Sequence, residues 1–132
     1  MKLKNYGFGQ VGEWGLKKGL KSGITFELPN FENERAIYAF VVNRKVKYIG
    51  VCQNSKTTLK DRMKRYKYWA GGGANERNAR KIRNCLKRGK AVKMFALKPE
   101  SSLRYHGLNV DLIKGLEDDL IHKLSPEWNR QK

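Results

Sequence analysis

The segment that decides the fold is residues 36–66, which read AIYAFVVNRKVKYIGVCQNSKTTLKDRMKRY. Two short runs rich in Val, Ile, Tyr and Phe flank the polar residues 43–45, and each run carries a tyrosine, Tyr38 or Tyr48. Such residues favour β-strands, and Asn43 tolerates the positive φ that a tight reversal needs. The segment therefore predicts a β-hairpin that leads directly into a basic helix.

The basic segment after the hairpin has the spacing of an amphipathic helix. Leu59, Met63 and Tyr66 recur at intervals of three and four residues, which places them on one face. Arg62 falls on the same stripe, so we expect its guanidinium on the side that faces the protein. A charge at that position indicates either a functional group or a structural ion pair.

Positive charge dominates the composition of this 132-residue chain. Lys and Arg number 29 against 12 Asp and Glu, so the net charge is +17. A chain of this length with 39% hydrophobic residues is expected to form a single domain, residues 1–132, without a second core. A positive potential over much of the surface favours nucleic acid as the partner, ahead of an anionic membrane.

Several other classes of protein are disfavoured. No apolar stretch approaches the length that crosses a bilayer, and the N-terminus lacks the apolar core of a signal peptide, so we expect a soluble, cytoplasmic protein with no membrane partner. Cys52 and Cys85 are expected to be reduced and buried. Their spacing from His106 and His122 is unlike the close ligand pairs of zinc sites.

Residues 1–30 are interpreted as a basic N-terminal arm that ends in an edge strand at residues 24–28. Residues 1–23 are rich in lysine and glycine and show no sustained helical period, so at most one helical turn is expected. Their G-x-G-x-x-G pattern lacks the preceding strand and following helix of a dinucleotide site. The arm either follows a phosphate backbone, with Lys17 and Lys18 as contacts, or packs against the domain.

A glycine-rich connection, residues 69–75, and a basic helix, residues 76–88, follow the first helix. We expect the connection to become ordered on binding. The apolar stripe of the helix comprises Ala79, Ile82, Cys85 and Leu86, and no acidic residue after Glu76 offsets its many cations. This face predicts phosphate contacts. The candidate DNA-binding residues on the two helices are Lys64, Arg65, Arg77, Arg80, Lys81 and Lys87.

The C-terminal third supplies a strand, residues 91–97, a loop, residues 100–108, and a long helix that Asn109 can cap. Glu117 lies on the apolar side of this helix, at the edge of the expected core, whereas Asp118 and Asp119 are expected to point outward. The order from residue 36 is strand, strand, helix, helix, strand, helix. It predicts an α+β fold with a small, mainly antiparallel sheet flanked by helices.

Five residues spread along this order resemble the GIY-YIG nucleases. Tyr38 and Tyr48 stand in two triplets, Ala36-Ile37-Tyr38 and Tyr48-Ile49-Gly50, that are similar to the hairpin motif of that family, with Ala36 in place of the first glycine. Arg62 on the next helix, Glu117 on the late helix and Asn129 after a proline complete the pattern. The resemblance spans residues 36–129 and implies that they form a catalytic core.

The resemblance also implies roles for these side chains. Glu117 would hold Mg²⁺ or Mn²⁺, since such ions need only one or two protein carboxylates beside water and phosphate. Arg62 would stabilise charge on the phosphate, unless it forms a structural ion pair with Glu117. Tyr38 would position or deprotonate the attacking water and Tyr48 would assist at the phosphate, although each needs a lowered pKa to act as a base. Two further residues are carried over as site residues, Tyr66 one turn after Arg62 and, mainly as structural support, Asn129.

Together these features predict a Mg²⁺-dependent DNA endonuclease. The little chain outside the core favours a compact restriction-type or phage enzyme that acts on double-stranded DNA, with a homodimer or higher oligomer for cutting both strands. The alternative is a non-catalytic, basic nucleic-acid-binding module, which accounts for the charge but not for inward-facing Arg62 and Glu117. Composition alone does not separate DNA from RNA as the substrate.

Overall fold

The computed structural model describes residues 2–54, 56–69, 72–100 and 102–129. The elements in chain order are α1 (Lys2–Asn5), β1 (Gly9–Leu16), β2 (Ile24–Glu27), β3 (Ile37–Val42), β4 (Lys45–Val51), α2 (Leu59–Lys67), α3 (Gly73–Lys87), β5 (Lys93–Leu97), β6 (Arg104–Tyr105), β7 (Leu108–Asn109) and α4 (Leu112–Leu124). The order from β3 to α4 is the predicted one, apart from the added β6–β7 pair.

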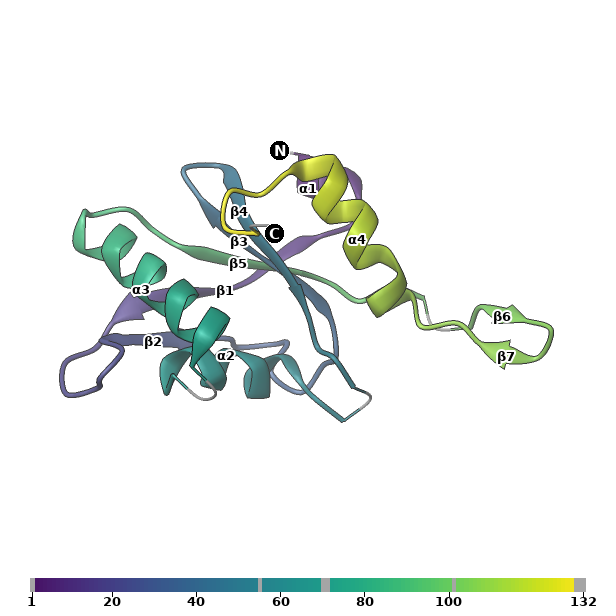
Figure 1. The fold of residues 1–132 in the computed structure, drawn as a ribbon, viewed down its shortest axis with the longest axis horizontal. Helices are drawn as coiled ribbons and strands as arrows, with labels where there is room; N and C mark the ends of the chain where they lie inside the picture. Colours follow the sequence, from purple (N-terminus) through teal and green to yellow (C-terminus); the bar gives the residue numbers. More distant parts are fainter. Residues whose placement is uncertain (1, 55, 70–71, 101, 130–132) are drawn as a thin grey trace.

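Five strands form one sheet in the order β2-β1-β5-β3-β4, and all neighbouring pairs are antiparallel (Figure 1). The short β6–β7 hairpin is separate and projects from one end of the molecule (Figure 1). The predicted α+β fold with an antiparallel sheet is confirmed. Strand β4 is at the edge of the sheet and carries Tyr48. The segment that packs along its open side therefore determines the surroundings of this tyrosine.

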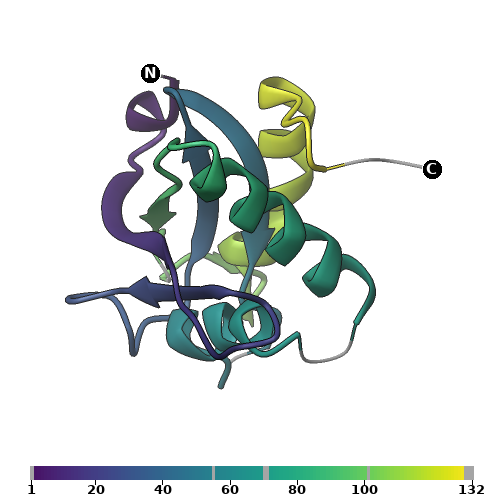
Figure 2. The ribbon, with the colours of Figure 1, turned by 90° about the vertical axis from the view of Figure 1, so that its left-hand side faces the viewer.

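Helices cover both faces of the sheet (Figures 1 and 2). On one face α2 and α3 pack through Met63, Tyr66 and Ile82 against Tyr38 and its neighbours. On the other face α1 and α4 pack against the alternate residues of β3 and β4, which include Ile37 and Ile49. This two-sided burial follows from the period of two along a strand, and it explains why all six residues of β3 are buried.

The β3–β4 hairpin contains two local features that shape its end and its edge. Asn43 and Arg44 both have positive φ, at 53° and 64°, as a two-residue turn between the paired residues Val42 and Lys45 requires. One strand register then shifts, because Phe40 pairs with Tyr48 while Val41 pairs with Val46. Lys47 is therefore the extra residue of a β-bulge, a feature that often re-aims neighbouring side chains.

The interpretation of residues 1–23 as an arm is wrong. After the single turn of α1, Gly9–Leu16 form β1, which lies inside the sheet between β2 and β5. Leu3, Phe8 and Trp14 are buried in the two cores, so this segment packs as part of the fold. The edge strand expected at residues 24–28 is present as β2.

Smaller differences concern element boundaries. Helix α3 begins at Gly73 rather than at residue 76, so the glycine-rich connection is shorter than expected, and its residues 70–71 lie outside the described residues. Strand β5 begins at Lys93 rather than at residue 91. The loop expected at residues 100–108 contains most of the β6–β7 hairpin. Cys52 is buried as expected, whereas Cys85 is only half-buried, and both are free thiols.

Within the described part of the chain, every helix is too short or too polar to span a bilayer.

Candidate active site

The open edge of β4 is covered by the segment that follows α4. The backbone N–H of Trp128 donates to the carbonyl of Lys47, the bulge residue, at 2.7 Å. The Asn129 side chain then accepts from the N–H of Ile49 at 2.7 Å and donates to its carbonyl at 2.8 Å. Asn129 therefore satisfies both backbone groups of an edge residue beside Tyr48, and it ties the end of the described chain to the hairpin.

Helix α4 is fixed at its N-terminus by a bidentate ion pair. The Arg35 guanidinium donates to both carboxylate oxygens of Asp111, at 3.1 and 2.8 Å, and also to the carbonyl of Cys52 at 3.1 Å. Asp111 is also the N-cap and accepts from the backbone N–H of Ile113. The hydrogen bonds from Arg35 lower the pKa of the Asp111 carboxyl. These contacts anchor the helix that carries Glu117.

Tyr48, Glu117 and Asn129 line one cavity of about 540 Å³, which we call the β4 cavity. Its walls come from β4, from the N-terminal half of α3, from α4 and from the segment after α4. Its other lining residues are Ala74, Arg77, Asn78, Lys81, Asp118, Ile121 and Trp128. Side chains far apart in the sequence thus place a phenol, two carboxylates, two amides and two cations around one space.

Glu117 is half-buried, and burial raises the pKa of its carboxyl. The neighbouring Asp118 carboxylate raises that pKa further, whereas the positive charge of Arg62 lowers it. Asp118 is exposed, as expected, and it also lines the same cavity. A partly desolvated carboxylate beside a second one is an environment that a cation stabilises.

Three predicted site residues, Tyr38, Arg62 and Tyr66, do not line the cavity and contact one another instead. The hydroxyls of Tyr38 and Tyr66 are 2.5 Å apart, and both side chains are 0% exposed. Arg62 donates to the Tyr66 hydroxyl at 3.3 Å, and its guanidinium carbon lies 5.1 Å from the centre of that ring. Burial raises the pKa of both phenols. Tyr48, which is only half-buried, is the hairpin tyrosine that lines the cavity.

Gly50 is required by the packing of Tyr38. A Cβ atom at position 50 would lie 2.5 Å from both the Cζ and the hydroxyl oxygen of Tyr38, and 2.9 Å from a ring carbon of Tyr48. Any larger residue would therefore push the two phenols away from their positions. The glycine of the Tyr48-Ile49-Gly50 triplet thus has a physical reason that the sequence alone does not reveal.

Arg62 is half-buried and held by polar partners rather than by a carboxylate. It donates to the Asn75 side chain at 3.3 Å, in addition to Tyr66. Among the described residues it forms no ion pair with Glu117, which argues against the purely structural pair considered above. Burial lowers the pKa of Arg62, but the three surrounding phenols outweigh this and keep it above its ordinary value. Its charge is therefore permanent.

Basic residues continue from the β4 cavity into a second hollow of about 380 Å³, the hairpin groove, which shares Lys81 and Trp128 with it. The groove lies between the β3–β4 turn and the C-terminal end of α3. Its basic residues are Lys45, Lys47, Lys81, Arg88 and Lys90. Cavity and groove together form one basic track along α3 and β4.

The candidate DNA-binding residues are divided among several places. Arg77 and Lys81 line the β4 cavity, whereas Arg80 on the same helix forms an ion pair with Glu76 at 2.9 Å. Three others, Lys64 and Arg65 on α2 and Lys87 at the end of α3, are exposed outside the cavity. Lys17 and Lys18 follow β1, near the sheet edge opposite β4.

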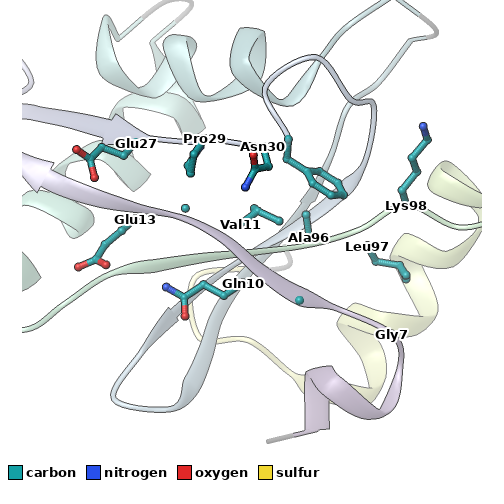
Figure 3. A pocket seen from close by; sticks show the side chains of 13 residues that line it. Gly7, Gln10, Val11, Glu13, Glu27, Pro29, Asn30, Ala96, Leu97 and Lys98 are labelled. Atoms are coloured by element: carbon teal, nitrogen blue, oxygen red, sulfur yellow. The ribbon is translucent and has the colours of Figure 1, made fainter.

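A larger hollow of about 740 Å³ lies beside β1 and is called the β1 hollow (Figure 3). Glycine and aliphatic residues form much of its wall, while Glu13 and Glu27 lie at one end and Lys98 at the other (Figure 3). Lys98 is already paired with Glu34 at 2.5 Å. None of the six catalytic candidates lines this hollow.

The β4 cavity fits a divalent ion of the Mg²⁺ type better than a site built for zinc. No group of three or more His, Cys, Asp or Glu side chains gathers in the described residues. Glu117 and Asp118 supply two carboxylates, and an ion that keeps most of its water needs no more from the protein.

The fold is an antiparallel α+β fold that is also found among nucleases. The chain superposes on an alanine variant of bacteriophage T4 EndoII with a TM-score of 0.76, at 21% identity over 98% of this chain and 96% of that one. It superposes on the restriction endonuclease HPY188I in complex with product DNA with a TM-score of 0.53, at 21% identity over 99% of this chain and 80% of that one. No protein-family model matches the chain, and no curated protein matches it in sequence.

Sequence reasoning missed two polar side chains of the β4 cavity, Asn78 and Asp118, and it also missed the hairpin groove. Asn78 is on the stripe of α3 that also carries Ile82 and Cys85, so its spacing could have revealed it. Asp118 is missed because helical spacing places it on the outer side, whereas the cavity opens at that edge. Lys45 and Lys47 gave no signal, since a strand lysine is ordinarily a solvated edge residue.

Proposed function

We propose that this protein is a GIY-YIG-type endonuclease that hydrolyses phosphodiester bonds of double-stranded DNA with the help of Mg²⁺ or Mn²⁺. The observation that carries the proposal is the convergence of Tyr48, Glu117 and Asn129, from three separate segments, on one cavity. Helix α3 lines this cavity with two cations. The shared fold with T4 EndoII and with a restriction endonuclease in complex with product DNA supports it.

Glu117, with Asp118 beside it, would hold the divalent ion at the α4 wall. When bound, such an ion supplies Lewis-acid stabilisation of the phosphate and of the leaving oxygen. The protein's contribution is to hold a half-buried carboxylate in place, through the Arg35–Asp111 pair at the start of α4 and through the packing of Ile113 and Leu120.

Tyr48 is assigned to direct contact with the reacting groups because its side chain lines the cavity. Tyr38 and Tyr66 are assigned a positioning role, since their hydroxyls bond to each other without exposure and burial raises the pKa of both. This proposal differs from the roles that the family resemblance implies, in which the first tyrosine contacts the water. Arg62 does not line the cavity, but its permanent charge acts on Glu117, which does, so it would stabilise negative charge on the phosphate through the electrostatic field.

The DNA backbone is proposed to follow the basic track from the β4 cavity into the hairpin groove. Arg77 and Lys81 would contact phosphates at the cavity, and Lys45 and Arg88 would contact them in the groove. Cations placed along a line can follow successive phosphates of one strand. Cleavage of both strands at one site would then require two copies of the site, which favours a homodimer of the restriction or phage type.

The direct test is incubation of the purified protein with supercoiled plasmid DNA, with Mg²⁺ and with EDTA. Nicked and linear products only in the presence of Mg²⁺ are expected. Binding to the plasmid without cleavage in Mg²⁺ or Mn²⁺ would contradict the proposal and favour a non-catalytic binding module. A parallel incubation with structured RNA determines whether the substrate is DNA rather than RNA.

A further inference from the structure

Asn78 on α3 is a buried polar residue that the protein itself leaves without a partner. Its residue is 3% exposed, yet none of the described residues forms a hydrogen bond with its carboxamide. Ser22, the other buried polar residue, donates to the carbonyl of Lys67 at 2.5 Å and accepts from the N–H of Ile24. Buried amides are normally paired. The carboxamide of Asn78 is instead left to the cavity that this residue lines.

The position of Asn78 indicates what its carboxamide can bind. It lines the β4 cavity from α3, as Glu117 does from α4, and Arg77 and Lys81 flank it on α3 at helical spacing. The cavity extends to Ala74 in the first turn of this 15-residue helix, where the N-terminal end of the helix dipole favours an anion. The α3 wall therefore suits an anion, and the α4 wall with its two carboxylates suits a cation.

We propose that Asn78 contacts the substrate, and that its Nδ2–H donates a hydrogen bond to an oxygen of the phosphate bound in the β4 cavity. This inference rests on the proposed nuclease function. The two cations on either side of Asn78 disfavour a metal ion next to its Oδ1, so the amide acts as a donor rather than as a metal ligand. Water can meet the amide in the free protein, and the phosphate oxygen then replaces it.

Two substitutions of similar size test this assignment. Asn78→Leu removes the donor, and we expect kcat to fall about 10- to 100-fold with less than about a twofold change in DNA affinity, because the net charge of the chain is unchanged. The melting temperature should stay about the same, because the described residues form no hydrogen bond with this amide that the substitution would remove. Asn78→Asp should lower kcat further, because its carboxylate repels the phosphate.

Ser22→Ala is the matched control, since it removes the other buried polar group, far along the chain from the cavity. It should lower the melting temperature and leave kcat unchanged, the reverse of the Asn78→Leu result. Wild-type kcat in Asn78→Leu, or a melting temperature that falls as much as in Ser22→Ala, would overturn the assignment. An active Asn78→Asp variant that needs less Mg²⁺ would also overturn it, in favour of a metal ligand. If the wild-type protein itself cuts no DNA, the proposed function fails, and the inference fails with it.

Discussion

The β1 hollow and the β4 cavity differ in what their walls bring together. The β1 hollow is the larger, at about 740 Å³ against 540 Å³, but glycines and aliphatic side chains form much of its wall (Figure 3). The β4 cavity gathers a phenol, two carboxylates, two amides and two cations from four segments. Glu27 lines the β1 hollow, and Glu117 lines the β4 cavity. Chemistry rather than size therefore locates the candidate site, and paired substitutions in the two spaces can test this contrast.

The largest difference is expected between Glu117→Gln and Glu27→Gln. Glu117→Gln should lower plasmid cleavage by at least about 10³-fold, because the divalent ion loses its main protein ligand. Binding to duplex DNA without metal should persist, since the change removes a negative charge from a protein of net charge +17. Glu27→Gln should leave both measurements unchanged. Equal activities for the two variants would remove the distinction between the two spaces.

Glycine substitutions offer a second pair. Gly50→Ala should lower the free energy of unfolding by about 1–3 kcal/mol, because the new Cβ would lie 2.5 Å from the Tyr38 hydroxyl. Cleavage should fall with it, since Tyr48 is displaced as well. Gly9→Ala, in the wall of the β1 hollow, meets no atom within 4 Å and should be tolerated. Urea unfolding and cleavage rates measure both effects, and a harmless Gly50→Ala would show that the tyrosine packing is not as described.

The salt dependence of DNA binding tests which cations contact phosphates. Replacing Arg77 and Lys81 together with glutamine should reduce the slope of log K against log salt by about 2, since each lost phosphate contact contributes about 0.9. Replacing Lys17 and Lys18 removes the same charge near the opposite sheet edge and should change the slope much less. A larger change of slope for the Lys17 and Lys18 variant than for the Arg77 and Lys81 variant would place the DNA near the sheet edge opposite β4.

The smallest expected effect concerns pH and stability without metal. Burial raises the pKa of the folded-state Glu117 carboxyl above its unfolded value, so its contribution is most favourable at low pH and is lost as pH rises through the folded pKa. In EDTA, Glu117→Gln should therefore gain stability relative to the wild type between about pH 4 and pH 7. Thermal melts at several pH values measure this difference. If Glu117→Gln instead loses stability relative to the wild type as the pH rises, the fold stabilises Glu117 as a carboxylate, which would contradict this prediction.

The sequence predicted local structure well where neighbouring residues determine it. The hairpin, its turn at Asn43 and the helix with Arg62 on its inner stripe all follow from short-range spacing. Strand β1 could not be predicted in the same way, because it is rich in glycine and its partner β5 lies about 80 residues further along the chain. Its place in the sheet depends on long-range pairing, which leaves no periodic signal in the strand itself.

The candidate site shows the same limit. Glu117 and Arg62 were selected because each is a charged residue on an apolar stripe of a helix. Asn78 also lies on such a stripe, but its side chain is neutral, so it was not selected. The sequence placed Tyr38 and Tyr48 on the two strands of one hairpin but could not show which of them reaches the cavity. That depends on α2, which encloses Tyr38 behind Tyr66, and on the bulge at Lys47 beside Tyr48.

The three tryptophans allow the central claim to be tested in one experiment. Trp128 lines the β4 cavity with Glu117, whereas Trp14 follows Glu13 of the β1 hollow along β1. In an NMR titration with Mn²⁺, whose unpaired electrons broaden nearby signals, the indole N–H signal of Trp128 should disappear first. It should persist in Glu117→Gln. Earlier loss of the Trp14 signal, or equal loss of both in the two proteins, would contradict a divalent-ion site in the β4 cavity.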